Sequence, residues 1–255
     1  MKIRMKTVAG LLIILAFSRV AGQDLTADDI IARSNELMNQ PTVTATTKMT
    51  ITTTSGQERE FIFESYAKNK GEKSLMKYIA PKRVKGQTIL MLNNADDIWA
   101  YFPRTNRVRK LATHAKKQKM EGSDFSYEDM GSGDAWLNEF TSSLLDDDKI
   151  DGSVCYKLEL LKNENSDSGY SRLLMWIDKE SYMPMRIDYF DEDDPQLHKK
   201  RLTISDIREI DNILTPMKMV MTDVQNDTDT VMEYEKISYG EELDDDLFTE
   251  RGMKR

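Results

Sequence analysis

The sequence predicts a mainly β (α+β) protein built on one long, strongly curved antiparallel sheet with two or three helices. Apolar and polar residues alternate with a period of two over much of the chain, and turn residues separate these segments at short intervals. Helical spacing is confined to a few stretches. This pattern is typical of an antiparallel meander, which leaves one face of its sheet to be covered.

The first 22 residues have the pattern of a secretory signal peptide. Lys2, Arg4 and Lys6 form a basic start, an apolar run covers residues 8–17, and small residues precede a cleavage site near Gly22. The run is shorter than the roughly 20 apolar residues of a spanning helix. We therefore expect export across the inner membrane and a periplasmic location, with an uncleaved N-terminal anchor as the alternative.

A helix is predicted from Thr26 to about Asn39. Thr26 and Asp29 have the spacing of a capping box, the apolar residues that follow share one face, and Pro41 ends the helix. A second segment at helical spacing, from Asp134 to Leu145, is expected to cover the sheet.

Most of the rest of the chain is a series of predicted strands. β-branched residues alternate with polar residues from Thr42, and Ser55-Gly56 marks the turn into an antiparallel return. The strands are expected over residues 42–51, 61–68, 74–79, 88–93, 98–102, 107–111, 153–161, 170–177, 185–190, 199–207, 214–223 and 230–238.

Composition limits the function. Without residues 1–22 the chain has 32 basic and 44 acidic residues, a net charge of −12, so nucleic acid is an improbable partner. No linker-like tract divides residues 23–255, which we interpret as one domain. Cys155 is the only cysteine, so an intramolecular disulfide is impossible; it is either a small strand residue or a reactive thiol.

No catalytic or metal-binding pattern is present in the sequence. His114 and His198 do not have metal-ligand spacing, and the motifs of hydrolases, nucleotide-binding proteins and zinc proteases are missing. The acidic runs at 146–148, 191–194 and 244–246 lack the donor spacing of a calcium loop. We therefore expect neither an enzyme nor a bound cofactor or metal.

Methionine is the residue type that points to binding. Of 16 methionines, 14 follow the predicted signal peptide, and many fall in predicted strands. Methionine is unbranched and polarizable, so it adapts to ligands of varied shape, although ordinary core filling explains it equally well.

Four phrases carry a family resemblance: PKRVKGQTILML, DDIWAYFPRTNRVRKL and MEGSDFSYEDM between Pro81 and Met130, and MWIDKESYMPMRIDYFD from Met175 to Asp191. In this order they resemble the outer-membrane lipoprotein-sorting proteins, relatives of the periplasmic carrier LolA, over about Asp28 to Phe248. The resemblance implies an incomplete barrel of the LolA/LolB type, with an apolar concave face and a helical lid over a cavity for acyl chains.

Two sets of site residues follow. The expected cavity lining is Met49, Ile51, Phe61, Phe63, Leu90, Leu92, Trp99, Tyr101, Met175 and Ile177, although both faces are apolar at residues 89–92. An acid-free basic stretch is the expected docking patch for anionic headgroups or an acidic partner, or else a solvated rim: Arg104, Arg107, Arg109, Lys110, Lys116, Lys117 and Lys119. Phe125 and Tyr127 are expected to seat a loop at the cavity mouth, with Asp124, Glu128 and Asp129 facing water or the basic hairpin.

The function predicted is that of a periplasmic carrier or chaperone for the acyl chains of lipoproteins or other lipids, on the way to the outer membrane. Its partners are expected to be the cargo, an inner-membrane exporter of the ABC or RND type and an outer-membrane acceptor. Two alternatives stay open: an accessory subunit of such an exporter, and an envelope-stress sensor or regulator on the same fold.

Overall fold

The computed structural model describes residues 25–131, 133 and 136–255. The predicted signal peptide, its cleavage site near Gly22, and Asp134 and Ala135 of the predicted cover segment lie outside the described residues. The described chain forms one antiparallel sheet of 14 strands. The strands are β1 (Thr42–Thr52), β2 (Glu58–Lys68), β3 (Lys73–Ala80), β4 (Thr88–Leu92), β5 (Asp97–Phe102), β6 (Arg107–Lys110), β7 (Phe140–Leu144), β8 (Asp148–Ile150), β9 (Ser153–Lys162), β10 (Tyr170–Asp178), β11 (Pro184–Asp191), β12 (His198–Ile210), β13 (Ile213–Asp223) and β14 (Thr228–Tyr239).

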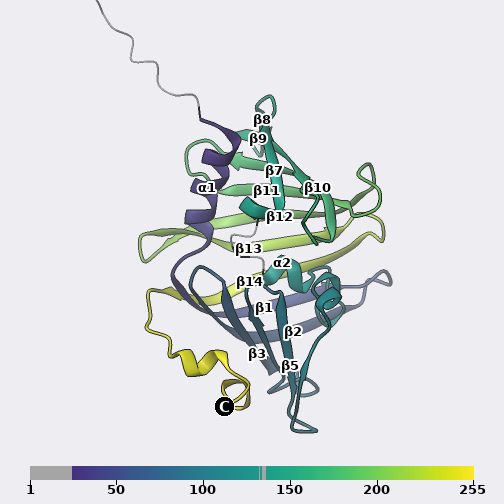
Figure 1. Ribbon diagram of the computed structural model, residues 1–255, viewed down its shortest axis with the longest axis vertical. Helices are drawn as coiled ribbons and strands as arrows, with labels where there is room; N and C mark the ends of the chain where they lie inside the picture. Colours follow the sequence, from purple (N-terminus) through teal and green to yellow (C-terminus); the bar gives the residue numbers. More distant parts are fainter. Residues whose placement is uncertain (1–24, 132, 134–135) are drawn as a thin grey trace, which may run out of the picture.

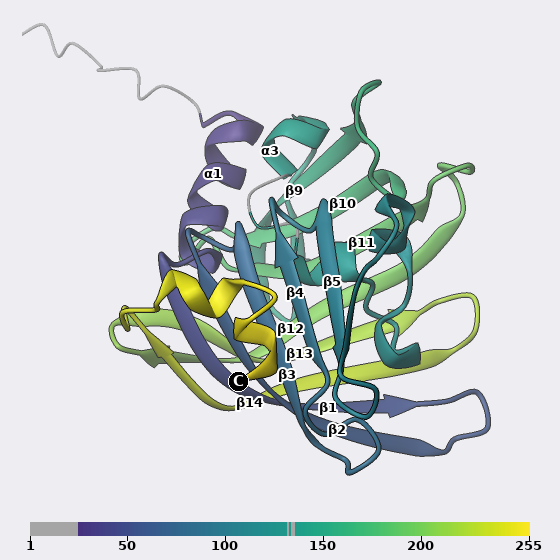
Figure 2. The same ribbon diagram turned by 60° about the horizontal axis from the view of Figure 1, so that its bottom comes forward.

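The sheet follows the order of the chain except at two places. Its order is β6-β5-β4-β3-β2-β1-β14-β13-β12-β11-β10-β9-β7, with β8 paired to β9, so only the β1–β14 and β7–β9 pairs join strands that are not consecutive. Within the described residues β6 and β7 end the sheet and do not pair with each other. Figures 1 and 2 show the sheet curving around its helices without closing into a barrel. The predicted curved, mainly β fold is confirmed.

Helices are few and short. The α-helices are α1 (Ala27–Met38), α2 (Tyr127–Gly131) and α3 (Trp136–Glu139), and the 3-10 turns are η1 (Thr113–Lys117), η2 (Met120–Gly122), η3 (Asp245–Phe248) and η4 (Gly252–Lys254). The predicted capping box of α1 is confirmed, because the Asp29 amide donates to Thr26 Oγ1 at 3.2 Å and the Thr26 amide donates to Asp29 Oδ2 at 3.0 Å.

The predicted cover helix from Asp134 to Leu145 is wrong over most of its described length. Only Trp136–Glu139 is helical, and Phe140–Leu144 forms edge strand β7, which pairs with β9 from Phe140↔Lys162 to Leu144↔Leu158. The free backbone edge of β9 offers this segment more hydrogen bonds than an isolated helix of its length would keep. Cover therefore comes from α1 and α2 instead.

The main core lies on the concave face. β1 shows the predicted alternation, since Ala45, Thr47, Met49 and Ile51 are buried and their neighbours are not. Ile30 and Ile31 bring the apolar face of α1 into the same cluster, and α1 crosses the sheet from β7 to β13 (Figure 1).

A second, smaller core lies on the outer face of β3–β5. Leu75 and Leu90 are buried there against Phe248 and Met253 of the C-terminal segment, which crosses these strands in Figure 2. Thr88 Oγ1 donates to the Met253 carbonyl at 3.0 Å, and Lys68 Nζ donates to the Leu243 carbonyl at 2.8 Å. The C-terminal segment is thus a strap that covers the outside of the sheet.

Candidate functional site

Two cavities adjoin beneath α1 and α2 on the concave side of the sheet. Cavity 1 has a volume of about 200 Å³ and cavity 2 of about 230 Å³. Cavity 1 is lined from α1, α2, β1–β4, β13 and β14, and cavity 2 from α1, α2 and β10–β14. Each exceeds the roughly 150 Å³ of an engineered apolar cavity that holds benzene.

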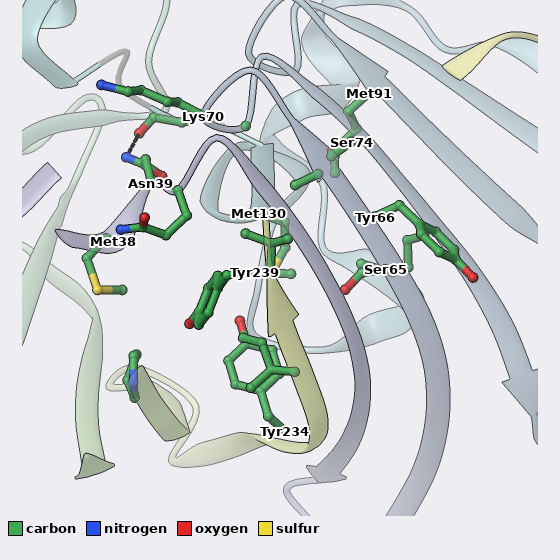
Figure 3. A pocket seen from close by; sticks show the side chains of 18 of the residues that line it. Met38, Asn39, Ser65, Tyr66, Lys70, Ser74, Met91, Met130, Tyr234 and Tyr239 are labelled. Carbon is green, nitrogen blue, oxygen red and sulfur yellow. Dashed lines mark hydrogen bonds between the residues drawn. The ribbon is translucent and has the colours of Figure 1, made fainter. Parts of the chain in front are cut away.

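The same few residues border both cavities. Met38 and Asn39 at the end of α1, Met130 of α2, Gly133 and Tyr234 of β14 line cavity 1 as well as cavity 2. Asn39 Nδ2 donates to the Gly133 carbonyl at 3.1 Å, which fastens the end of α1 to the segment after α2 (Figure 3). The two cavities therefore share a border at these residues.

The lining is mostly apolar and rich in methionine. Cavity 1 is lined by Met38, Met76, Met91 and Met130, and cavity 2 by Met38, Met130, Met175, Met219 and Met221. Ser74 Oγ of cavity 1 and Asn35 Nδ2 of cavity 2 are buried and have no hydrogen-bond partner among the described residues. Lys70 is exposed at the edge of cavity 1, so this cavity reaches solvent there.

The segment Gly-Ser-Asp-Phe-Ser-Tyr-Glu-Asp, residues 122–129, positions α2 over these cavities. Asp124 is buried: its amide donates to Thr230 Oγ1 at 2.9 Å, and its carboxylate accepts from Thr228 and Thr230 at 2.9 Å each. This ties the start of the segment to β14. Phe125 then points into cavity 2 and is 3% exposed.

Asp129 makes the deepest charge contact of α2. Its carboxylate is ion-paired with Lys200 of β12, and the two side chains are 2% and 8% exposed. Tyr170 Oη donates to Asp129 Oδ1 at 2.9 Å, and the Lys200 ammonium lies 4.8 Å from the centre of the Tyr170 ring. Burial, followed by the charges of Asp129 and Glu128, raises the pKa of Tyr170 well above its usual value, so this hydroxyl stays a donor.

Glu128 fastens the other side of α2 to the loop before β10. Its carboxylate accepts from Ser168 Oγ and from the Gly169 amide, the latter at 3.0 Å. A Cβ atom at position 169 would lie 3.0 Å from Glu128 Oε2, so glycine permits this approach. Burial raises the pKa of Glu128, although both hydrogen bonds oppose the shift. We call Asp124, Glu128 and Asp129 with their partners the α2 latch.

The structure corrects the expectation for these acids. Asp124 and Glu128 are buried, and the Asp129 carboxylate is nearly so, so they do not face water; Asp124 does pair with Lys119 of the expected basic stretch, at 3.1 Å. Partners distant in sequence account for the burial: Lys200 of β12 for Asp129, Thr228 and Thr230 of β14 for Asp124, and the loop before β10 for Glu128.

The structure splits the ten residues expected to line a cavity into two groups. Met49, Ile51, Phe61, Phe63, Met175 and Ile177 lie in the main concave cluster, and of these Met175 borders cavity 2. Leu90, Leu92, Trp99 and Tyr101 lie on the outer face with the C-terminal strap. The face expected to point inward in β4 and β5 is thereby corrected: Ile89, Met91, Ile98 and Ala100 face the main core.

The expected docking patch is also divided. Arg104, Arg107, Arg109 and Lys110 are exposed around the β5–β6 hairpin. By contrast, Lys116 is ion-paired with Asp167, Lys117 with Glu192 at 2.7 Å, and Lys119 with Asp124 at 3.1 Å and Asp223 at 2.8 Å. Of these three lysines only Lys116 is buried; Lys117 and Lys119 are exposed, but their ammonium groups pair with acids of the same chain.

Residues with reactive side chains do not assemble into a site. Cys155 is buried in β9, and burial raises the pKa of its thiol. Within the described ranges, no group of three or more His, Cys, Asp and Glu side chains is placed to hold a metal ion. In the same part of the chain, no helix is long and apolar enough to cross a membrane.

Sequence reasoning missed the β14 side of the site. Met232 and Tyr234 face inward at even positions, whereas Ile237 and Tyr239 line cavity 1 at odd positions. The change follows a shift in the β1–β14 register, from Thr46↔Lys236 to Thr47↔Tyr234. A β-bulge of this kind breaks the period of two, so alternation alone does not reveal both pairs.

The described chain is a curved antiparallel sheet with covering helices and two mostly apolar cavities. Comparisons with known proteins place it in a family. A family model described as "Uncharacterized protein" matches residues 70–255. A DUF1329 family protein from Desulfovibrio piger is 26% identical with a TM-score of 0.82, covering 89% of this chain and 97% of its own. No curated protein matches the chain.

Two further solved structures share the fold. A domain from Vibrio parahaemolyticus named for outer membrane lipoprotein sorting is 23% identical, with a TM-score of 0.80 and coverage of 90% and 98%. A LolA superfamily protein from Nitrosomonas europaea is 19% identical, with a TM-score of 0.74 and coverage of 89% and 98%. The chain belongs to the family whose model matches residues 70–255, and it shares a LolA-like fold with these solved structures, in agreement with the resemblance of its motifs.

Proposed function

We propose that this protein is a periplasmic carrier that holds the acyl chains of lipoproteins, or of other lipids, in the two cavities beneath α1 and α2. The observation that carries the proposal is the pair of adjoining, methionine-lined cavities on the concave face. Residues 23–255 act as one carrier unit after export, and no cofactor or catalytic step is needed.

The chemistry of the lining suits an acyl chain. Each buried methylene contributes about 0.8 kcal/mol, and methionine side chains adapt to chains of different length and branching. Met38 and Met130 stand between the cavities, so their rotation lets one chain extend from cavity 1 into cavity 2. The unpaired groups of Ser74 and Asn35 offer hydrogen bonds to an ester or amide of the cargo.

Loading and release follow from the same geometry. α1 and α2 cover the cavities, so cargo enters when they move away, and a tightly closed lid would retain it. Release is then driven by a partner or acceptor that binds the opened state better than the closed state. An inner-membrane exporter of the ABC or RND type on the loading side and an outer-membrane acceptor on the other side fit these roles.

The test is to purify the protein from its own periplasm, measure it by native mass spectrometry, and identify the co-purifying lipids after organic extraction. We expect bound lipoprotein or acyl chains in sub-stoichiometric to stoichiometric amounts. A second arm adds a fluorescent fatty acid to delipidated protein. Protein that is empty as isolated and does not take up the fatty acid would overturn the proposal.

A further inference from the structure

An arginine-lined groove lies at an end of β3–β6, away from the residues that line the two cavities. It has a volume of about 360 Å³ and is lined by Arg83, Val84, Gln87, Phe102, Pro103, Arg104, Thr105 and Arg109. Three of these residues are arginines and none is acidic. We call this feature the arginine groove; it lies beside the turn that follows β5.

Two turns build the groove together, one after β3 and one between β5 and β6. The turn after β3 is closed by the Gly86 amide, which donates to the Tyr78 carbonyl at 2.7 Å. The β5–β6 turn is closed by the Thr105 amide, which donates to the Phe102 carbonyl at 3.2 Å. A Cβ atom at position 86 would lie 3.5 Å from Pro103 Cγ, so the two turns touch.

Aromatic rings hold two of the guanidinium groups in place. The Arg83 guanidinium carbon lies 4.7 Å from the centre of the Phe61 ring, and that of Arg109 lies 5.9 Å from the Phe102 ring. Stacking of this kind leaves the N–H donors of the guanidinium edge free to bind an anion. Phe61 is a core residue with 0% exposure, so Arg83 stands on a rigid base.

In the part of the chain that the structure describes, none of the three arginines is ion-paired. Among the described residues, no carboxylate lies within 4.0 Å of Arg83, Arg104 or Arg109, whereas Lys116, Lys117 and Lys119 are all ion-paired. Glu121 lies beside the groove but is hydrogen-bonded to Gln87 at 2.8 Å. Exposed Lys82, Lys85 and Arg107 extend the same positive surface, in a chain whose net charge is −8.

We infer that the arginine groove docks the protein on an anionic phospholipid surface, with headgroup phosphates bound between the arginines. Charge complementarity supports this occupant, because basic side chains on two turns face outward together and carry no internal counter-charge. The half-buried Phe102 and Pro103 between them match the apolar boundary beneath the headgroups. The inference goes beyond the proposed carrier function, since docking needs no cargo in the cavities.

The experiment is vesicle co-sedimentation of delipidated full-length mature protein, with vesicles of phosphatidylglycerol and of phosphatidylcholine. We expect binding to phosphatidylglycerol that weakens as salt is raised from 50 to 500 mM, and no binding to phosphatidylcholine, because exposed charges are screened by salt. The triple variant Arg83→Gln, Arg104→Gln, Arg109→Gln should lose affinity on the order of 100-fold, about a factor of five for each basic residue.

A matched variant has the same change in net charge elsewhere. Lys149→Gln, Arg208→Gln and Lys236→Gln replace three exposed cations outside the groove, and this variant should keep the affinity within about threefold. The double variant Arg83→Gln, Arg104→Gln keeps Arg109 over Phe102 and replaces the triple variant if that one misfolds. Its affinity for phosphatidylglycerol vesicles should fall more than tenfold. Equal binding by the triple and matched variants would overturn the inference. So would failure of the parent protein to prefer phosphatidylglycerol, which would favour an acidic protein partner.

Discussion

The carboxylate of Asp129 on α2 is ion-paired with the ammonium of Lys200 on β12, and only 2% and 8% of these side chains are exposed. The pair joins the short helix that carries Met130 to a strand that also lines cavity 2. Removal of one partner would leave an uncompensated buried charge, whereas removal of both would not. This asymmetry makes the pair a direct test of the α2 latch.

Asp129→Asn is expected to lower the free energy of unfolding by about 3–5 kcal/mol, because Lys200 would stay charged and buried. Urea denaturation followed by tryptophan fluorescence measures it. The double variant Asp129→Leu, Lys200→Met should recover most of the loss. Asp206→Asn, which breaks an exposed pair with Arg208 on β12, is the control and should leave the urea midpoint unchanged. A single variant as stable as the parent would show that the pair does not hold α2.

Ser65→Phe is expected to block cavity 1. Ser65 lines this cavity (Figure 3), and a phenyl ring would displace about two methylenes of an acyl chain, so fatty-acid affinity should fall about tenfold. Fluorescence titration with a labelled fatty acid measures it. Ser143→Phe places the same ring on exposed β7 and should bind as the parent does. Unchanged affinity of Ser65→Phe would remove cavity 1 from the proposed site.

Met130→Ala is expected to join the two cavities, because Met130 borders both. The substitution should cost about 2 kcal/mol of stability and shift the preferred acyl chain toward greater length. Native mass spectrometry after incubation with an equimolar mixture of fatty acids gives the distribution. Met185→Ala removes a partly buried methionine that lines neither cavity, so its distribution should match the parent. If both variants select the same lengths, Met130 does not divide the binding space.

Phe248→Ala is expected to loosen the C-terminal strap. Phe248 is 4% exposed against Leu75 and Leu90, and truncation of a buried phenylalanine costs about 3–5 kcal/mol. Thermal unfolding should occur at a lower temperature, and binding of an apolar dye should rise as the outer face of β3–β5 is uncovered. Leu197→Ala, at a residue that is 39% exposed, is the comparison and should change neither readout. An unchanged melting temperature for Phe248→Ala would contradict the role of the strap.

Asp188→Asn is expected to change how stability depends on pH. Burial raises the pKa of Asp188, but hydrogen bonds from Arg186 and Arg201 outweigh burial and hold the pKa below its ordinary value. A carboxyl with a lowered folded pKa stabilises the protein above about pH 4, the unfolded value, and this contribution is lost as pH falls through the folded pKa.

At pH 7 the Asp188→Asn variant should therefore be about 2 kcal/mol less stable. This loss is smaller than for a fully buried ion pair, because the Arg186 and Arg201 side chains are 25% and 37% exposed and solvent screens their charges. The difference should shrink as pH falls below 4. Urea unfolding at pH 7, 4 and 3 measures this, with Asp193→Asn in an exposed turn as the control. A difference that stays constant with pH would show that the Asp188 charge is not the cause.

The local order of this protein is encoded by residues close together in the chain. Thr26 and Asp29 define the start of α1, the alternation from Thr42 defines β1, and the phrases around Asp124 identify the family. Each of these signals lies within a few residues of the structure that it specifies, because capping and strand alternation are properties of neighbouring side chains.

Contacts between distant parts of the chain set which faces of the sheet are covered and which charges are paired. β4 is apolar on both faces, and its outer face became a second core because Phe248 and Met253, more than 150 residues later, cover it. Lys119 was expected in the docking patch, but its ammonium is ion-paired with Asp223 of β13 at 2.8 Å. Because of the β14 bulge, Tyr234 and Tyr239 both line cavity 1, although one has an even and the other an odd residue number. Burial and ion pairing depend on partners that are distant in sequence, so local periodicity does not specify them.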